Sequence, residues 1–178
     1  MSKTDILNLS RAYHFAAGKH VAQRRKGEAA EPYINHLTEV AHMVAEATQG
    51  HDPEAVIAAV LHDCVEDTET TFAELEAAFG PRVAALVGEV TDDKSLEKQV
   101  RKDLQVEHAA HASPAAKMIK LADKTSNLRS MAASPPAGWS DQRRMEYVAW
   151  AGRVVDACRG ASPWLESQFD EAVAAFKL

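Results

Sequence analysis

The sequence predicts an all-α protein, a single domain over residues 1–178 with about eight to ten helices. Aromatic residues make up only 6% of the chain, while alanine is abundant. We find no segment with the period-two alternation of a half-buried strand. Helix-start signals, in which a capping side chain precedes a proline, recur along the chain. A length of 178 residues suits one domain with a core.

Four helices are expected in the first half of the chain. The first ends before a basic run at 24–26 and a loop at 27–35 that contains Gly and Pro. The second carries apolar side chains at helical spacing, and the third begins with Asp52 as its cap. A capping box that starts at Thr71 opens the fourth. With boundaries uncertain by about 2–4 residues, these helices span 4–22, 36–48, 53–67 and 71–79.

Five further helices are expected in the second half. Gly80-Pro81 ends the fourth helix and begins the fifth, and Ser113-Pro114 and Ser162-Pro163 each place a cap before a proline. The stretch 133–139 is rich in Pro and Gly and predicts a loop. The helices are therefore expected at 81–92, 95–111, 114–132, 140–158 and 162–176.

Charge and composition exclude several classes of partner. The formal net charge is −6, from 20 Lys and Arg against 26 Asp and Glu, so nothing attracts the whole chain to nucleic acid or to an anionic membrane. No apolar run has the length of a membrane span, and the N-terminus lacks a signal peptide's apolar region. Cys64 and Cys158 have no CxxC spacing, which predicts a reducing, cytoplasmic setting. The oligomeric state is left open, with a homodimer as one option.

The segment Leu61–Thr68, which reads LHDCVEDT, places four polar side chains at the end of a wholly apolar helix. On a continuous helix His62, Asp63, Glu66 and Asp67 share one face. The three carboxylates repel one another and stand where the helix dipole disfavours negative charge. A solvated helix end is the ordinary alternative, but the apolar run before it favours a bound divalent cation.

Two other segments offer ligands for such a cation. His36 begins the apolar stripe of its helix and points inward, although a lone inward histidine is more often a core residue. Asp123 lies in the middle of an apolar helix, where Lys120 or Lys124 is its ordinary alternative partner. Two imidazoles and two carboxylates suit Mn²⁺, Fe²⁺ or Zn²⁺ better than Ca²⁺. The other histidines are not expected to be ligands: His42, His108 and His111 are expected at the surface, and His14, His20 and His51 lack a carboxylate-rich context.

The motifs EPYINH, AAVLHDCVEDT, VTDDK and KMIKLADKTSNLR closely resemble the hydrolase domain of RelA/SpoT-type alarmone enzymes, within the HD phosphohydrolase superfamily. The resemblance runs over about residues 8–175 and is nearest to the stand-alone small alarmone hydrolases. It implies a Mn²⁺-dependent enzyme that removes the 3′-diphosphate from guanosine 3′,5′-bis(diphosphate), ppGpp, or its pentaphosphate relative pppGpp. The products are GDP or GTP and diphosphate.

The resemblance also implies roles for individual residues. It makes His36, His62, Asp63 and Asp123 the metal ligands, with Glu66 and Asp67 as the catalytic acidic pair. It departs at Thr125-Ser126, where relatives carry a larger residue before Asn127, so less side chain is expected to stack on a base. Three tryptophans, Trp139, Trp150 and Trp164, are expected to pack instead of holding a base. The implied substrate contacts are Arg25, Lys26, Lys98, Asn127, Arg143 and Tyr147.

Two other functions stay open on the sequence. The same metal site suits removal of the 2′-phosphate of NADPH, or hydrolysis of another nucleotide, because each places a phosphate on a ribose. From a different class, a non-catalytic helical module that binds a nucleotide is the second alternative. That alternative would be favoured if a metal ligand or a residue of the acidic pair were missing, but the four ligands and both acidic residues are all present.

Overall fold

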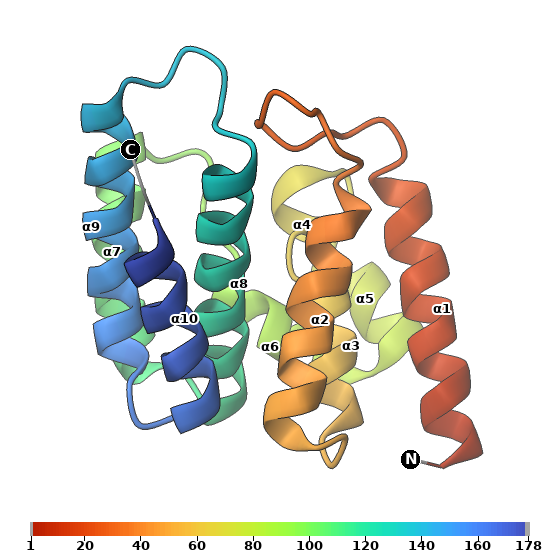
Figure 1. Ribbon diagram of the computed structural model, residues 1–178. Coiled ribbons are helices and arrows are strands. Elements are labelled where there is room, and N and C mark those ends of the chain that lie inside the picture. Colours follow the sequence, from red (N-terminus) through yellow and green to blue (C-terminus); the bar gives the residue numbers. More distant parts are fainter. Residues whose placement is uncertain (1, 177–178) are drawn as a thin grey trace.

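A computed structural model describes residues 2–176, and within them it has ten α-helices and no strand (Figure 1). The expectation of an all-α fold is thereby confirmed. None of these helices combines the length and apolar character needed to cross a membrane. The helices are α1 (Lys3–Lys19), α2 (Ile34–Thr48), α3 (Pro53–Leu61), α4 (Cys64–Asp67), α5 (Phe72–Phe79), α6 (Pro81–Val90), α7 (Lys98–His111), α8 (Pro114–Ala133), α9 (Asp141–Cys158) and α10 (Pro163–Ala175).

Helix α8 joins the two sides of the molecule. It packs against α2 and α6 on one side and against α9 and α10 on the other, as Figure 1 shows. Helix α3 lies among α1, α2 and α6, and every residue from Ala55 to Leu61 is buried. A helix that is apolar all round is stable only in such a position. The packing therefore brings the ends of α2 and α3 next to the middle of α8.

The expected helix over 53–67 is wrong in one respect, because it is interrupted at His62 and Asp63. The Nδ1 of His62 lies 2.8 Å from the carbonyl oxygen of Ala59. In an unbroken helix that oxygen accepts from the backbone N–H of residue 63, so the imidazole competes with the helix ladder. The break turns the Asp63 side chain toward α2 and α8, and the chain resumes as the short α4.

Other boundaries differ by a few residues. Helix α1 ends at Lys19 instead of residue 22, because His20 and Gln23 form a turn in which the Gln23 N–H donates to the His20 carbonyl over 3.0 Å. Helix α2 begins two residues early, at Ile34, and α7 begins at Lys98.

Two loops meet at one end of the molecule, above α2 and α8 in Figure 1. Residue Gly27, in the loop that follows α1, pairs with Pro136, in the loop that follows α8, as an isolated β-bridge. The Ala29 N–H also donates to Ser134 Oγ over 2.9 Å. We call this contact the loop clasp. It ties the N-terminal basic run to the C-terminal side of the fold.

Candidate metal centre and substrate cleft

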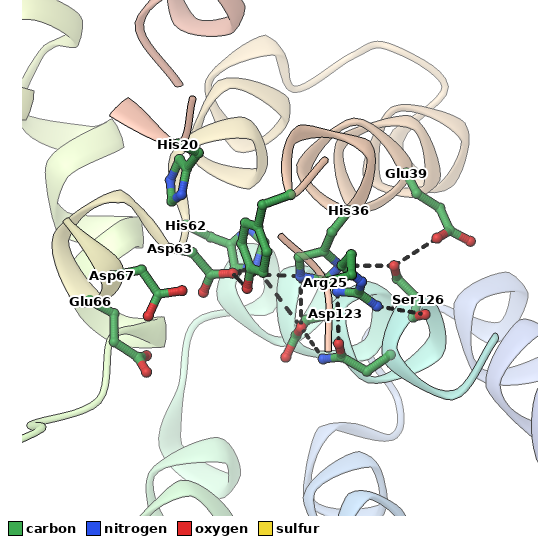
Figure 2. Close-up of polar contacts among 12 residues, drawn as sticks. His20, Arg25, His36, Glu39, His62, Asp63, Glu66, Asp67, Asp123 and Ser126 are labelled. Atoms are coloured by element: carbon green, nitrogen blue, oxygen red, sulfur yellow. Dashed lines mark hydrogen bonds and ion pairs between the residues drawn. The ribbon is translucent and has the colours of Figure 1, made fainter. Parts of the chain in front are cut away.

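Four side chains converge where the ends of α2 and α3 meet α8, and we call them the metal-site cluster: His36, His62, Asp63 and Asp123. His36 Nε2 lies 3.3 Å from Asp123 Oδ1 and 3.6 Å from Asp63 Oδ2. His62 Nε2 lies 3.2 Å from Asp63 Oδ2 and 4.0 Å from Asp123 Oδ1. Figure 2 shows the two imidazoles and two carboxylates facing one another. All four residues that the sequence singled out as ligands are thus in one place.

The orientation of both imidazoles fits a divalent cation. His62 Nδ1 donates to a backbone carbonyl, and His36 Nδ1 lies 2.8 Å from Ser126 Oγ. The Nε2 atoms of both rings are buried and have no hydrogen-bond partner among the described residues. Ligand atoms of His36, His62 and Asp123 lie within 4.8 Å of one another. Buried polar atoms ordinarily have partners, so two unpaired nitrogens beside two carboxylates are suited to hold a metal.

The cluster shifts the pKa values of its own members. Burial opposes the charged form of His62, but the adjacent charges of Asp63 and Asp123 outweigh it and raise its pKa to about 9. Burial also opposes ionisation of Asp123, yet Lys124, 2.8 Å away, and the two imidazoles hold the pKa of that carboxyl well below its usual range. The carboxylates therefore favour a positive charge at this place, and a metal ion supplies one without a proton.

The acidic pair Glu66 and Asp67 lies on α4, beside the cluster and not within it (Figure 2). Glu66 accepts a backbone N–H, from Asp92 at 3.2 Å, and its Oε1 lies 3.8 Å from Lys94 Nζ. Burial, followed by the charges of Asp63 and Asp92, raises the pKa of Glu66 to about 7. Asp67 instead accepts from Gln23 Nε2 over 2.7 Å and pairs with Lys94. The two neighbouring carboxyls therefore differ in their surroundings and hydrogen-bond partners.

A cavity of about 560 Å³ opens beside the cluster, and we call it the inner cavity. Its lining holds seven Lys or Arg residues against four Asp or Glu residues, and those four are the two cluster carboxylates and the acidic pair. Lys120 and Lys124 are among these cations although both are buried. A cavity with this excess of cations suits an anionic ligand.

A second cavity of about 540 Å³, the outer cavity, lies between α7 and α9. It shares Lys26, Tyr147 and other lining residues with the inner cavity, so the two form one cleft. Its lining holds five Lys or Arg residues against two Asp or Glu residues, and Lys98 and Arg143 are among the five. The cleft as a whole can therefore hold a ligand with negative charge at two separate places.

The six residues expected to contact substrate all line this cleft, but they differ in how freely they can do so. Arg25 is bound to α8, because its guanidinium donates to Asn127 Oδ1 over 3.1 Å and to Ser130 Oγ over 3.3 Å. Asn127 in turn donates to Asp123 Oδ1 over 2.6 Å. Lys26, Lys98, Arg143 and Tyr147 face the outer cavity. Their roles toward a substrate stay predictions.

The structure adds to three interpretations made from the sequence. His20, which lacks a carboxylate-rich context in the sequence, is buried: its ring stacks on Tyr33 and its Nδ1 lies 2.5 Å from Gln23 Oε1. Ser126 is fully buried and lines neither cavity, so its small size removes no stacking surface for a base. Trp150 is buried and Trp139 is half-buried against the core, in agreement with the expected packing roles, and both also line the two cavities. These details depend on side-chain directions that helical spacing alone does not give.

Sequence reasoning also missed residues that support the site. The Tyr33 hydroxyl donates to Asp63 Oδ2 over 2.7 Å, and Lys94 lies between the carboxylates of Glu66 and Asp67. The motifs EPYINH and VTDDK contain both residues, so the signal was present in the sequence. Gln23 belongs to no motif that we identified, and only the fold places it against Asp67.

A protein-family model described as an HD domain matches residues 12–151, which include the whole metal-site cluster. The chain belongs to this HD domain family. The membership agrees with the resemblance to the HD phosphohydrolase superfamily that the sequence motifs indicated, and with the expected all-α fold.

Similar proteins of known name extend this relationship over most of the chain. A Drosophila melanogaster protein named guanosine-3′,5′-bis(diphosphate) 3′-pyrophosphohydrolase MESH1 is 50% identical over 157 residues, covering 88% of each chain. The human protein of the same name is 48% identical over 163 residues, covering 92% of this chain and 91% of the other. A solved structure, described as a metazoan ortholog of SpoT that hydrolyzes ppGpp, superposes with a TM-score of 0.90 at 47% identity and covers 94% of both chains.

Proposed function

We propose that this HD-domain protein is a metal-dependent hydrolase of ppGpp and pppGpp, which releases the 3′-diphosphate and leaves GDP or GTP. The observation that carries the proposal is the metal-site cluster, with two unpaired imidazole nitrogens facing two carboxylates at one end of a cation-lined cleft. Relatives that align over about nine-tenths of the chain carry the name of this activity.

His36, His62, Asp63 and Asp123 would hold the metal, for which we propose Mn²⁺. When bound, such an ion lowers the pKa of water and offsets the negative charge of the phosphate that is attacked. Glu66 is the stronger candidate to accept a proton, because its pKa of about 7 lies near neutral pH. Asp67, held by Gln23 and Lys94, is better suited to orient water or the leaving group.

The cations in the cleft would bind the two diphosphates separately. Lys120 and Lys124 lie near the metal-site cluster, where the scissile 3′-diphosphate must be. Lys98 and Arg143 lie in the outer cavity, where a 5′-diphosphate can be neutralised. The Arg143 guanidinium also lies over the Trp139 ring, 4.2 Å from its centre, so an aromatic side chain borders this cation. A nucleotide with charge at both ends fits this arrangement.

Parallel incubations with ppGpp and with NADPH, each with Mn²⁺ and with a chelator, test the proposal. We expect GDP and diphosphate from ppGpp in Mn²⁺ and no product in chelator. If only NADPH gave a product, namely free phosphate, the metal-dependent chemistry would still hold, but the substrate would be NADPH instead of ppGpp. Binding of both nucleotides without any product would instead favour the non-catalytic module.

A further inference from the structure

The ring of His36 is contacted on the side away from the metal-site cluster by a chain of polar groups. Ser126 Oγ lies 2.8 Å from His36 Nδ1 and donates its proton to Glu39 Oε2 over 2.7 Å. Arg129 Nη1 lies 3.3 Å from the other Glu39 oxygen, and Arg129 Nη2 donates to Gln168 on α10 over 2.7 Å. Figure 2 shows Ser126 between the imidazole and the Glu39 carboxylate.

The hydrogen bonds in this chain determine which nitrogen of the His36 imidazole carries the hydrogen. A serine hydroxyl has one proton and two lone pairs, and here the proton is directed at Glu39. Ser126 Oγ can then only accept from His36, so His36 Nδ1 must carry the hydrogen. In a neutral imidazole the other nitrogen, Nε2, is left with its lone pair. That atom is the one that faces Asp63 and Asp123.

We infer, on the basis of the proposed metal site, that Ser126 and Glu39 are positioning residues that hold His36 in its metal-binding tautomer and orientation. The carbonyl of Ala59, which can only accept, likewise keeps a hydrogen on His62 Nδ1 and leaves Nε2 facing the cluster. The backbone thus fixes one histidine, while a serine and a glutamate 87 residues apart in sequence fix the other. Such groups behind a ligand raise its affinity for metal, and their loss typically lowers metal affinity about 10–100-fold.

Adjacent residues on α8 provide a matched pair of variants. Ser126 and Thr125 are both fully buried hydroxyl residues. Thr125 Oγ1 donates to the Leu121 carbonyl over 2.8 Å, and no contact joins it to His36 among the described residues. Ser126→Ala removes the hydroxyl behind the ligand, whereas Thr125→Val removes a hydroxyl that only contacts its own helix.

Titration of each full-length variant with Mn²⁺ by calorimetry measures the effect without turnover. We expect Ser126→Ala to raise the Kd for Mn²⁺ about 10–100-fold and Thr125→Val to change it less than about threefold. Glu39→Gln keeps the side-chain shape at a half-buried site and should raise the Kd by a smaller factor. It serves as the test if Ser126→Ala fails to fold.

Nitrogen NMR of the protein loaded with Zn²⁺, which is diamagnetic, adds a spectroscopic readout. A proton on His36 Nδ1 should be observed in the wild type and in Thr125→Val, and should exchange rapidly in Ser126→Ala. Equal Kd values in all variants, or equal losses in Ser126→Ala and Thr125→Val, would overturn the inference. A wild type that binds no Mn²⁺ would overturn the proposed function itself, so the two failures are distinct.

Discussion

The inner end of the cleft, around His36 and Asp123, consists of buried and half-buried side chains that hold one another in place, whereas the outer end, around Lys98 and Arg143, is lined by exposed cations. No hydrogen bond or ion pair joins the Lys98 side chain to another group among residues 2–176, and Arg143 rests on an aromatic ring. At the inner end each ligand has a second partner behind it.

This difference follows from what each end must do. Groups that act on a reacting centre need fixed geometry, and burial with complete hydrogen bonding provides it. Exposed cations attract an anion over a distance without a fixed position, and salt screens them. We therefore expect substitutions at the inner end to abolish chemistry and substitutions at the outer end to weaken substrate binding.

The largest effect is expected from Asp123→Asn at the inner end. The substitution keeps the shape but removes the charge that faces both imidazoles. Activity should fall by more than about 100-fold, because removal of a group that only supports a metal ligand already lowers metal affinity or activity roughly 10–100-fold. Steady-state kinetics with saturating Mn²⁺ measures the loss, with Asp103→Asn, an exposed carboxylate on α7, as the control. A fall of less than tenfold would contradict the assignment of Asp123.

Glu66→Gln should lower kcat by about 10²–10⁴-fold, the usual contribution of a proton-transfer group, and leave Mn²⁺ affinity nearly unchanged. A carboxyl with a pKa of about 7 is protonated below that pH and accepts a proton only above it, so wild-type activity should rise with pH. A bound cation lowers this pKa, which places the acid limb at or below pH 7.

A pH–rate profile of both proteins checks this expectation. The acid limb should be missing in Glu66→Gln and retained in Glu69→Gln, a nearby exposed position. If the limb persists in Glu66→Gln, the proton acceptor is another group, and Asp67 becomes the first alternative.

Gly27→Ala tests the loop clasp, whose residues Gly27, Ser134 and Pro136 line the inner cavity. A Cβ on Gly27 would lie 2.4 Å from the Ser134 carbonyl oxygen and 2.6 Å from its Oγ, so a loop must move. Overpacking of this kind typically costs about 1–3 kcal/mol of unfolding free energy. Because residues 24–27 line the inner cavity, KM should rise as well.

Gly18→Ala is the matched control for the clasp. It lies within α1, and nothing lies within 4 Å of an added Cβ, so it should stabilise the helix by about 0.5–1 kcal/mol. Urea denaturation compares the two variants. A Gly27→Ala protein as stable as the wild type would show that the two loops of the clasp can move apart without lowering the free energy of unfolding.

The smallest effect is expected at the outer end. Lys98→Gln or Arg143→Gln should raise KM by about two- to fivefold, the range of a single exposed charge pair, with kcat nearly unchanged. The difference from the wild type should shrink as NaCl is raised to about 1 M, where the Debye length is about 3 Å. Lys3→Gln, on α1, is the control. A fall in kcat would place these cations at the reacting phosphate and weaken the distinction between the two ends.

The sequence by itself determined the helices and the identity of the ligand-bearing motifs. Capping residues such as Asp52 and Thr71 act on their own helix: Asp52 accepts from the Ala55 N–H over 3.1 Å, and Thr71 accepts from the Glu74 N–H over 3.2 Å. Only this half of the predicted capping box is present, because the Glu74 side chain pairs with Lys19 instead. The apolar run before His62 predicted a fully buried helix because no face of it is polar. These features are local, so propensity and spacing suffice to identify them.

Only the tertiary structure decided how those motifs meet. The break at His62 arises from a side chain that competes for a backbone carbonyl, and helical spacing contains no sign of it. The contact of Ser126 with His36 spans 90 residues, and that of Gln23 with Asp67 spans 44. Each depends on the packing of helices distant in sequence, which places particular atoms within hydrogen-bond reach; the residue types alone do not fix that distance.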